Sequence, residues 1–263
     1  MPELPEVEAA AGQLRQAALG RTIRAVEPLH PALARSLPPV ACQGLAGRTI
    51  AAVARRAKIQ LVTLDDGQVL EVHFRMTGDW AFGVGTDPIP VTERLRIHCT
   101  DGSRVSLIDA RALAVLRLHP PGELQLPPLG PEPLTEAFTV EAFREALARR
   151  RGPIKVVLLD QRVVAGVGNI YAAEALWLAR IHPSRVAATL TRPRLLALRD
   201  AIRDVLATAP VGRYFASAET VAADDAHWRV YGREGAPCPR CARSIRRLMQ
   251  AGRSSYYCPG CQR

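Results

Sequence analysis

Four cysteines near the end of the chain form two close pairs, CPRC at 238–241 and CPGC at 258–261, separated by sixteen residues. Each C-x2-C can aim two thiolates at one ion, and four thiolates complete a tetrahedral zinc shell. A redox pair would not need a second copy at this spacing, and structural disulfides are rare in the cytoplasm. The spacing therefore predicts one structural zinc ion held by Cys238, Cys241, Cys258 and Cys261, with no position open for chemistry.

The segment between the two cysteine pairs, ARSIRRLMQAGRSSYY, is basic and aromatic. We expect it to form a β-hairpin finger suited to a phosphate backbone. The other two cysteines, Cys42 and Cys99, stand alone, and we interpret both as ordinary buried thiols.

The charge of the chain favours a polyanionic partner. Its formal net charge is +10, and residues 233–263 hold seven arginines and one acid. A second basic cluster consists of Arg149, Arg150, Arg151 and Lys155. An arginine-rich composition inherited from a GC-rich genome would explain the overall charge equally well. Clustering of charges of one sign, however, causes self-repulsion that a partner of opposite sign relieves.

The N-terminus lacks a basic stretch followed by an apolar one, and no run of 18 apolar residues occurs. These features predict no secretion signal and no membrane span, so we expect a cytoplasmic protein.

The first half of the chain has the pattern of a helix followed by short strands. Pro5, Glu6 and Glu8 suit the first turns of a helix over 5–19. Strands rich in Val, Ile and Leu are predicted at 48–56, 58–64, 68–74, 94–100, 104–109 and 113–119. LDDGQ and TDGSR read as hairpin turns. We expect an antiparallel sandwich or barrel.

The second half begins after a proline-rich linker, PPGELQLPPLGPEPL at 120–134, which can be neither helix nor central strand. Helices are predicted at about 136–150, 153–161, 169–180 and 191–208, the last with Thr191 as its cap. The predicted organisation is α+β, with domains at 1–119, 135–232 and 233–263 around the linker.

The stretch VVAGVGN places Gly166, Gly168 and Asn169 at the start of a helix. The N–H groups of a first helical turn can bind an anion such as a DNA phosphate. A tight turn between packed helices accounts for the glycines equally well, and we slightly favour it.

Together these motifs resemble the formamidopyrimidine-DNA glycosylase / endonuclease VIII family of base-excision repair enzymes. The matching pieces are PELPEVE at 2–8, RRAK at 55–58, MTG at 76–78, LGPEPL at 129–134, GVGNIYA at 166–172, VYGREG at 230–235 and the cysteine ribbon. Leu4 and Val7 favour the formamidopyrimidine branch. The resemblance implies an N-terminal β-sandwich with an N-terminal helix, a helix-two-turn-helix domain and a zinc-finger hairpin.

The resemblance gives the N-terminal residues a chemical role. Removal of Met1 would expose Pro2 as a secondary amine, which titrates far closer to neutrality than a lysine. It could attack C1′ of a damaged nucleotide as a covalent nucleophile, with Glu3 as the proton carrier. Glu6 lies one helical turn further on and either faces the same substrate pocket or complements the helix dipole.

Other roles carry over by motif. Lys58 matches the lysine assigned to β-elimination, and Arg253 matches the finger arginine that grips the lesion phosphate and assists δ-elimination. Met76 matches the residue that fills the hole left by an extruded base. His73 is a candidate phosphate ligand or a packed strand histidine. The remaining matches are phosphate contacts at Arg150, Lys155, Gly168 and Asn169.

The chain departs from the family at the segment that usually reads DPRRFG, where it has DARALA. Arg111 matches the arginine that reads the opposite base, Leu113 replaces the phenylalanine wedge and Ala112 replaces the second arginine. TER stands where a histidine is expected before the 94–100 strand. The segment 209–229 is shorter than the family's capping loop. These departures bear on lesion range and opposite-base preference.

The first expectation is a monomeric, nucleoid-associated bacterial glycosylase with lyase activity, acting on oxidised purines in damaged double-stranded DNA. Two alternatives stay open: an endonuclease VIII-like enzyme for oxidised pyrimidines, and a non-catalytic zinc-ribbon DNA-binding homologue.

Overall fold

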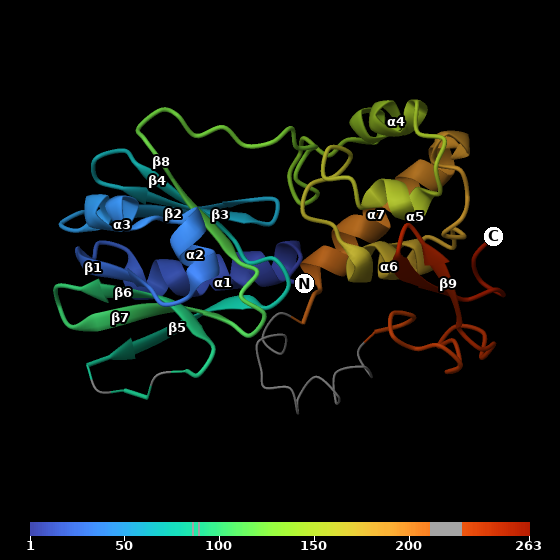
Figure 1. The fold of residues 1–263 in the computed structure, drawn as a ribbon. Coiled ribbons are helices and arrows are strands. Elements are labelled where there is room, and N and C mark those ends of the chain that lie inside the picture. Colours follow the sequence, from blue (N-terminus) through green and yellow to red (C-terminus); the bar gives the residue numbers. More distant parts are fainter. Residues whose placement is uncertain (86, 89, 211–227) are drawn as a thin grey trace. The chain divides into compact units, whose positions relative to one another are not determined.

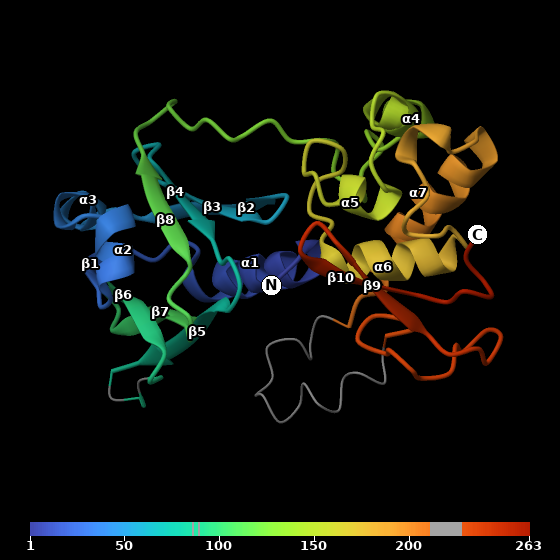
Figure 2. The ribbon, with the colours of Figure 1, turned by 45° about the vertical axis from the view of Figure 1, so that its right-hand side comes forward.

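The computed structural model describes residues 1–85, 87–88, 90–210 and 228–263 (Figures 1 and 2). The chain divides into two compact units, one of Met1–Pro2 with Glu6–Leu126 and one of Glu3–Pro5 with Pro127–Arg263. The division falls inside the proline-rich segment that we expected to be a linker. The finer domain boundaries at 119, 134 and 232 stay predictions.

The first unit contains two antiparallel four-stranded sheets (Figure 1), with strand orders β1-β6-β7-β5 and β2-β3-β4-β8. In β6, Leu95 and Ile97 alternate with more exposed residues and, together with Leu107 of β7, fill the core. The strands are β1 Ile23–Pro28, β2 Ile50–Arg56, β3 Ile59–Leu64, β4 Val69–His73, β5 Gly78–Val84, β6 Glu93–Cys99, β7 Ser103–Asp109 and β8 Val115–His119.

Three helices belong wholly or largely to this unit. α1, Leu4–Ala18, lies where the sequence predicts it and buries Val7, Ala10 and Leu14. α2, Pro31–Ser36, and α3, Pro39–Leu45, were not predicted. Each begins at a proline and is too short to show a helical hydrophobic period. α2 contacts both β1 and β8.

The second unit is helical and carries a β-hairpin. α6 is its central helix, with seven consecutive buried residues from Tyr171 to Trp177, and it contacts α5, α7 and β10 (Figure 2). The elements are α4 Val140–Ala148, α5 Ile154–Leu158, α6 Asn169–Leu178, η1 Ala187–Thr189, α7 Arg192–Ala207, β9 Arg246–Gln250 and β10 Arg253–Tyr257.

Two local predictions about this unit have different outcomes. The finger hairpin is confirmed, with β9 and β10 joined by a turn at Ala251 and Gly252, both at positive φ. Thr191 does occupy the N-cap of α7, but its side chain makes no capping hydrogen bond.

The α+β fold class is confirmed, and both Cys42 and Cys99 are buried. No helix of the described ranges is long and apolar enough to cross a membrane.

Candidate functional site

Within the second unit, the Glu3 carboxylate lies at the N-terminus of α6. Its oxygens accept the backbone N–H of Gly168 at 2.6 Å, of Ile170 at 2.9 Å and of Tyr171 at 3.4 Å. Gly168 is the N-cap residue and has no side chain with which to cap the helix. A carboxylate from 165 residues earlier therefore performs the capping, and these three bonds fix the position of Glu3.

Gly166 allows the N-terminal segment to approach this turn. Its φ is +81°, and a Cβ built on it would lie 2.6 Å from Leu4 Cβ. The Leu4 N–H donates to the Gly166 carbonyl at 3.0 Å. The glycine thus serves a tight turn against Leu4. The N–H groups of Gly168, Ile170 and Tyr171 are bonded to Glu3, so the idea that this first turn offers them to a phosphate does not fit the structure. DNA contacts from Gly168 and Asn169 stay predictions.

The predicted site residues Lys155, Asn169 and Arg253 lie near the N-terminal end of α6. The Lys155 ammonium donates to Asn169 Oδ1 and, at 3.4 Å, to the Ser254 carbonyl, which also accepts Asn169 Nδ2 at 3.1 Å. Burial, aided by the Arg253 charge and opposed by the Glu3 charge, lowers the pKa of Lys155 to about 8. These contacts join α5, α6 and β10 into one cluster.

The members of this cluster differ in access to a ligand. Lys155 is only 1% exposed, so in this structure it supports Asn169 and the hairpin from inside. Arg253 is exposed and directly follows the β9–β10 turn. Arg150 is not among the hydrogen-bonded groups of the cluster; its guanidinium pairs with Asp160 at 3.1 Å.

The four predicted metal ligands come together. Their sulfur atoms all lie within 4.8 Å of one another, with Cys238 to Cys261 at 3.9 Å and Cys241 to Cys258 at 3.4 Å. Sulfur atoms about 2.3 Å from a tetrahedral zinc are about 3.8 Å apart, so the cysteines fit the ion. Trp177 Nε1 and the Arg240 N–H each donate to Cys238 Sγ at 3.4 Å, as expected for a thiolate ligand. These cysteines hold one structural zinc ion.

In the first unit, Lys58 lies in the turn between β2 and β3. It is 6% exposed and follows Ala57, whose φ is +53°. Arg55 secures this turn, because its Nη1 donates to the Ala57 carbonyl at 3.0 Å while its Nε donates to Glu8 of α1 at 2.6 Å. The lysine is therefore held on an anchored turn.

His73 lies close enough to Lys58 to be affected by its charge. Burial, aided by the charges of Arg75 and Lys58, lowers the pKa of His73 to about 4, so the imidazole is neutral at pH 7. Its Nδ1 accepts the Arg75 N–H at 3.0 Å, which leaves the proton on Nε2. The neutral imidazole of His73 can therefore donate one hydrogen bond, from Nε2–H, to an acceptor such as a phosphate oxygen.

Pro2 and Glu6 are both buried, Glu6 to 2% exposure, whereas Met1 is 36% exposed. With Met1 attached, the Pro2 nitrogen is an amide and has no nucleophilic lone pair. The roles of both residues stay predictions.

Two loops at one end of the first unit carry Met76, Arg111 and Leu113. Met76 is 38% exposed and Leu113 is 42% exposed. Asp109, which sequence reasoning did not select, is buried between the loops and binds both. The only sequence signal for it was its position at the head of DARALA. Within TER, Arg94 Nε donates to the Asp109 carbonyl at 2.8 Å.

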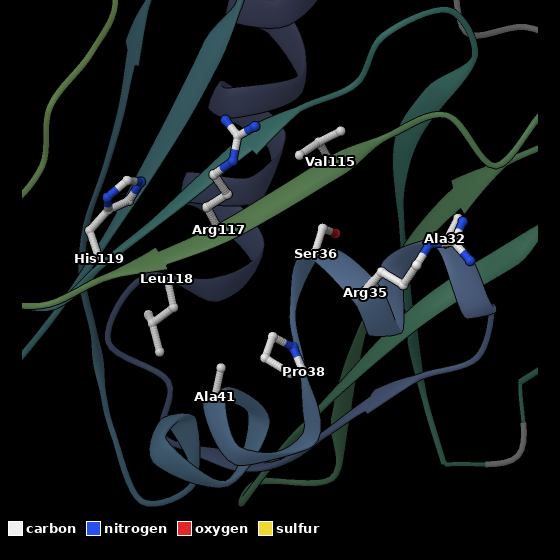
Figure 3. Close-up of a pocket in the computed structure, with 9 residues that line it drawn as sticks. All are labelled: Ala32, Arg35, Ser36, Pro38, Ala41, Val115, Arg117, Leu118 and His119. Carbon is white, nitrogen blue, oxygen red and sulfur yellow. The ribbon is translucent and has the colours of Figure 1, made fainter.

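A cavity of about 590 Å³ lies elsewhere in the first unit, between β8 and the α2–α3 segment (Figure 3). It contains none of the predicted site residues. Figure 3 shows Arg117 and His119 extending from β8, and Arg35 and Ser36 from α2. Most of the segment 209–229, where we expect a short capping loop, lies outside the described residues.

Three family models match the chain in order. They are the formamidopyrimidine-DNA glycosylase N-terminal domain over residues 1–116, the formamidopyrimidine-DNA glycosylase H2TH domain over 129–214, and a zinc finger found in FPG and IleRS over 235–263. This sequence of domains agrees with the predicted fold.

Individual proteins match over the whole chain. A formamidopyrimidine-DNA glycosylase of Paracoccus denitrificans is 41% identical, covering 100% of both chains. The Lactococcus lactis FPG (MutM) in complex with Fapy-dG containing DNA has a TM-score of 0.89 at 31% identity, covering 99% of this chain and 100% of that one. The same protein with an oxidised pyrimidine containing DNA has a TM-score of 0.90 at 32% identity, covering 100% of both. These matches agree with the resemblance drawn from the motifs.

Proposed function

This chain belongs to the formamidopyrimidine-DNA glycosylase family, and we propose that it removes oxidised purines, 8-oxoguanine and formamidopyrimidines, from double-stranded DNA and then cuts the strand. The observation that carries the proposal is the anchoring of Glu3. Its three hydrogen bonds to the start of α6 hold the residue that directly follows Pro2. A proton carrier beside a nucleophile must be held in this way to act repeatedly in one geometry.

The chemistry begins with removal of Met1, which frees the secondary amine of Pro2. The amine nitrogen bonds to C1′ of the lesion, the glycosidic bond breaks, and the departing base takes the electron pair and a proton relayed by Glu3. After the amine proton is lost, the nitrogen lone pair forms a double bond to C1′ as the C1′–O4′ bond breaks, and O4′ takes a proton relayed by Glu3. The sugar ring opens and an iminium ion remains, which makes the C2′ hydrogen acidic. Removal of that proton expels the 3′ phosphate by β-elimination, and Lys58 is the proposed participant.

The other predicted residues hold the DNA. His73 donates its Nε2–H to a phosphate, Asn169 contacts another, and Arg253 grips the lesion phosphate and assists δ-elimination. Lys155 supports Asn169 and the hairpin from inside, while Arg150 acts at the edge of the same interface. Met76, Arg111 and Leu113 fill the space left by the extruded nucleotide. We propose that one chain suffices, in the bacterial cytoplasm at the nucleoid.

The zinc ion supplies structure only, because four thiolates occupy all its positions. Through β9 and β10 it holds Arg253 at the end of a short hairpin, which could not keep its shape alone.

Glu6 either lines the lesion pocket or supports the helix dipole, and Glu6→Gln in the assay below distinguishes the two by its effect on the excision rate.

A second candidate is an enzyme for oxidised pyrimidines. It is favoured by the similarity to a family member solved with an oxidised pyrimidine containing DNA and by the replacement of the aromatic wedge with Leu113. A smaller wedge discriminates less by stacking, so both lesion classes could be accepted.

Single-turnover cutting of matched duplexes decides among these functions. The duplexes carry 8-oxoguanine, a formamidopyrimidine or thymine glycol, each opposite its normal partner, and gel analysis separates β- from δ-elimination ends. We expect fastest cutting of the purine lesions. Cutting of thymine glycol alone would support the pyrimidine enzyme, and binding without cutting would support a non-catalytic homologue. Arg253→Ala should lower binding and δ-product, whereas Arg192→Ala, whose guanidinium pairs with Glu141 at 2.6 Å on the surface, serves as control.

A further inference from the structure

Asp109, the last residue of β7, has every acceptor position of its carboxylate engaged. It is 1% exposed. Its Oδ1 accepts the Thr77 hydroxyl and, at 3.1 Å, the Arg111 N–H. Its Oδ2 accepts the Leu113 N–H at 2.6 Å and the Ala114 N–H at 2.7 Å. A carboxylate offers about four lone-pair sites, so these four donors saturate it.

These bonds join two loops that are distant in sequence. Thr77 belongs to the turn between β4 and β5, whereas Arg111 and Leu113 belong to the turn between β7 and β8. The link is doubled, because the Arg111 N–H also lies 3.2 Å from Thr77 Oγ1. Within the second loop Ala112 adopts a φ of +51°, a conformation that a loop without such anchors would seldom hold.

The side chains carried by the two loops point outward. Met76 and Leu113 are among the exposed large hydrophobic residues, and Arg111 is also exposed. Apolar side chains on a rigid, solvent-facing surface indicate a contact surface for a partner. A flexible loop would lose about 1–2 kcal/mol per residue of backbone entropy on entering a duplex, and a loop that is already ordered avoids that loss.

We propose that Asp109 is a positioning residue that couples the two loops, so that Met76, Arg111 and Leu113 enter the duplex together during base extrusion. This inference rests on the proposed function. It locates control of extrusion and of opposite-base reading in a buried carboxylate that does not itself touch DNA. The coupling matters more here than in a chain with DPRRFG, because neither a phenylalanine nor a second arginine stabilises this surface.

The test compares variants that remove different parts of the network. Asp109→Ala removes all four hydrogen bonds that the carboxylate accepts, and Thr77→Val removes only the link between the loops. Asp109→Asn is milder, since the amide oxygen can still accept from Leu113 and Ala114 while its NH2 donates to the Thr77 hydroxyl. The matched control is Asp101→Ala. Asp101 accepts from Ser103 N–H at 3.0 Å and Ser103 Oγ at 2.6 Å at the β6–β7 turn, the opposite end of β7.

Each variant is assayed under single turnover on an 8-oxoguanine:cytosine duplex and on a duplex with a preformed abasic site, which needs no base extrusion. For Asp109→Ala we expect excision to fall about 30-fold, equivalent to about 2 kcal/mol at 1.36 kcal/mol per tenfold. Thr77→Val should lose about fivefold and Asp109→Asn an intermediate amount. Abasic cutting should change by less than about threefold in every variant, as should both rates in Asp101→Ala.

A second readout is the fluorescence of 2-aminopurine placed beside the lesion, which reports unstacking directly. Slower unstacking in Thr77→Val, at an unchanged unfolding midpoint, supports the coupling even if Asp109→Ala does not fold. Equal losses of excision and abasic cutting, or none in Thr77→Val and Asp109→Asn, would overturn it. If the natural chain cuts neither substrate, the proposed function fails instead, and the fluorescence signal still tests the coupling.

Discussion

Substitution of Gly166 by alanine tests whether the turn before α6 exists to receive the N-terminal segment. Alanine at a φ of +81° costs about 1–2 kcal/mol in the left-handed region. The added Cβ would also lie 2.6 Å from Leu4 Cβ and 2.7 Å from Leu4 Cδ1. Such overpacking typically costs about 1–3 kcal/mol more. The expected loss in the free energy of unfolding is therefore about 2–5 kcal/mol.

Gly235 provides a matched control, because its φ is also +81° and a Cβ there would meet nothing within 4 Å. Gly235→Ala should show only the backbone cost. At about 3 °C per kcal/mol, its unfolding midpoint should fall by about 3–6 °C, against about 6–15 °C for Gly166→Ala. Displacement of Leu4 should also move Glu3, so abasic-site cutting by Gly166→Ala should fall about 100-fold. The two midpoints, measured by circular dichroism, decide the matter. If Gly166→Ala is no less stable than Gly235→Ala and cuts normally, the close approach of Leu4 is not what this glycine serves.

Three further predictions concern other parts of the chain. Metal analysis should find about one zinc per chain, and Cys258→Ser should lose the metal and most DNA affinity while the first unit stays folded; full affinity in a zinc-free chain would contradict this. The pKa of His73 is about 4 in the folded chain and about 6.5 when unfolded, so its stabilising contribution is present above pH 6.5 and is lost as the pH falls toward 4. Denaturant titrations should accordingly show a smaller acid-side loss of stability in His73→Asn, and identical pH profiles would show that the histidine is not perturbed. Leu113→Phe should speed excision of 8-oxoguanine and leave abasic-site cutting nearly unchanged, because an aromatic wedge adds about 1–3 kcal/mol of stacking; single-turnover rates that rise equally on both substrates would argue against a wedge.

The regular elements were predictable where local pattern dominates. The strands from Ile50 to His73 and from Glu93 to His119 are short runs rich in Val, Ile and Leu, and the turns between them carry DDG and DGS. β1 was missed because a bulge between Ile23 and Ala25 breaks the alternation. β5 was missed because it begins with Gly78 and Asp79, which disfavour strands in isolation.

In the candidate site, too, the features set by local sequence were predictable and those set by the tertiary fold were not. The cysteine ligands follow from spacing alone, because a C-x2-C turn is a local structure. The contacts of Glu3 with α6 and of Asp109 with Thr77 join residues far apart in sequence, and only the tertiary fold brings them together. Burial of Lys155 was likewise invisible, since a charged residue in a basic run is usually solvated and only the fold encloses it with Asn169 and Ser254.

Borohydride trapping followed by mass mapping of the adduct tests directly whether Pro2 is the nucleophile. The mature chain, with Met1 removed, is reacted with an 8-oxoguanine duplex, reduced and digested. We expect one covalent adduct on the peptide that begins at Pro2, and none when an N-terminal extension keeps the Pro2 nitrogen as an amide. An adduct on Lys58, or efficient cutting by the extended chain, would contradict this expectation.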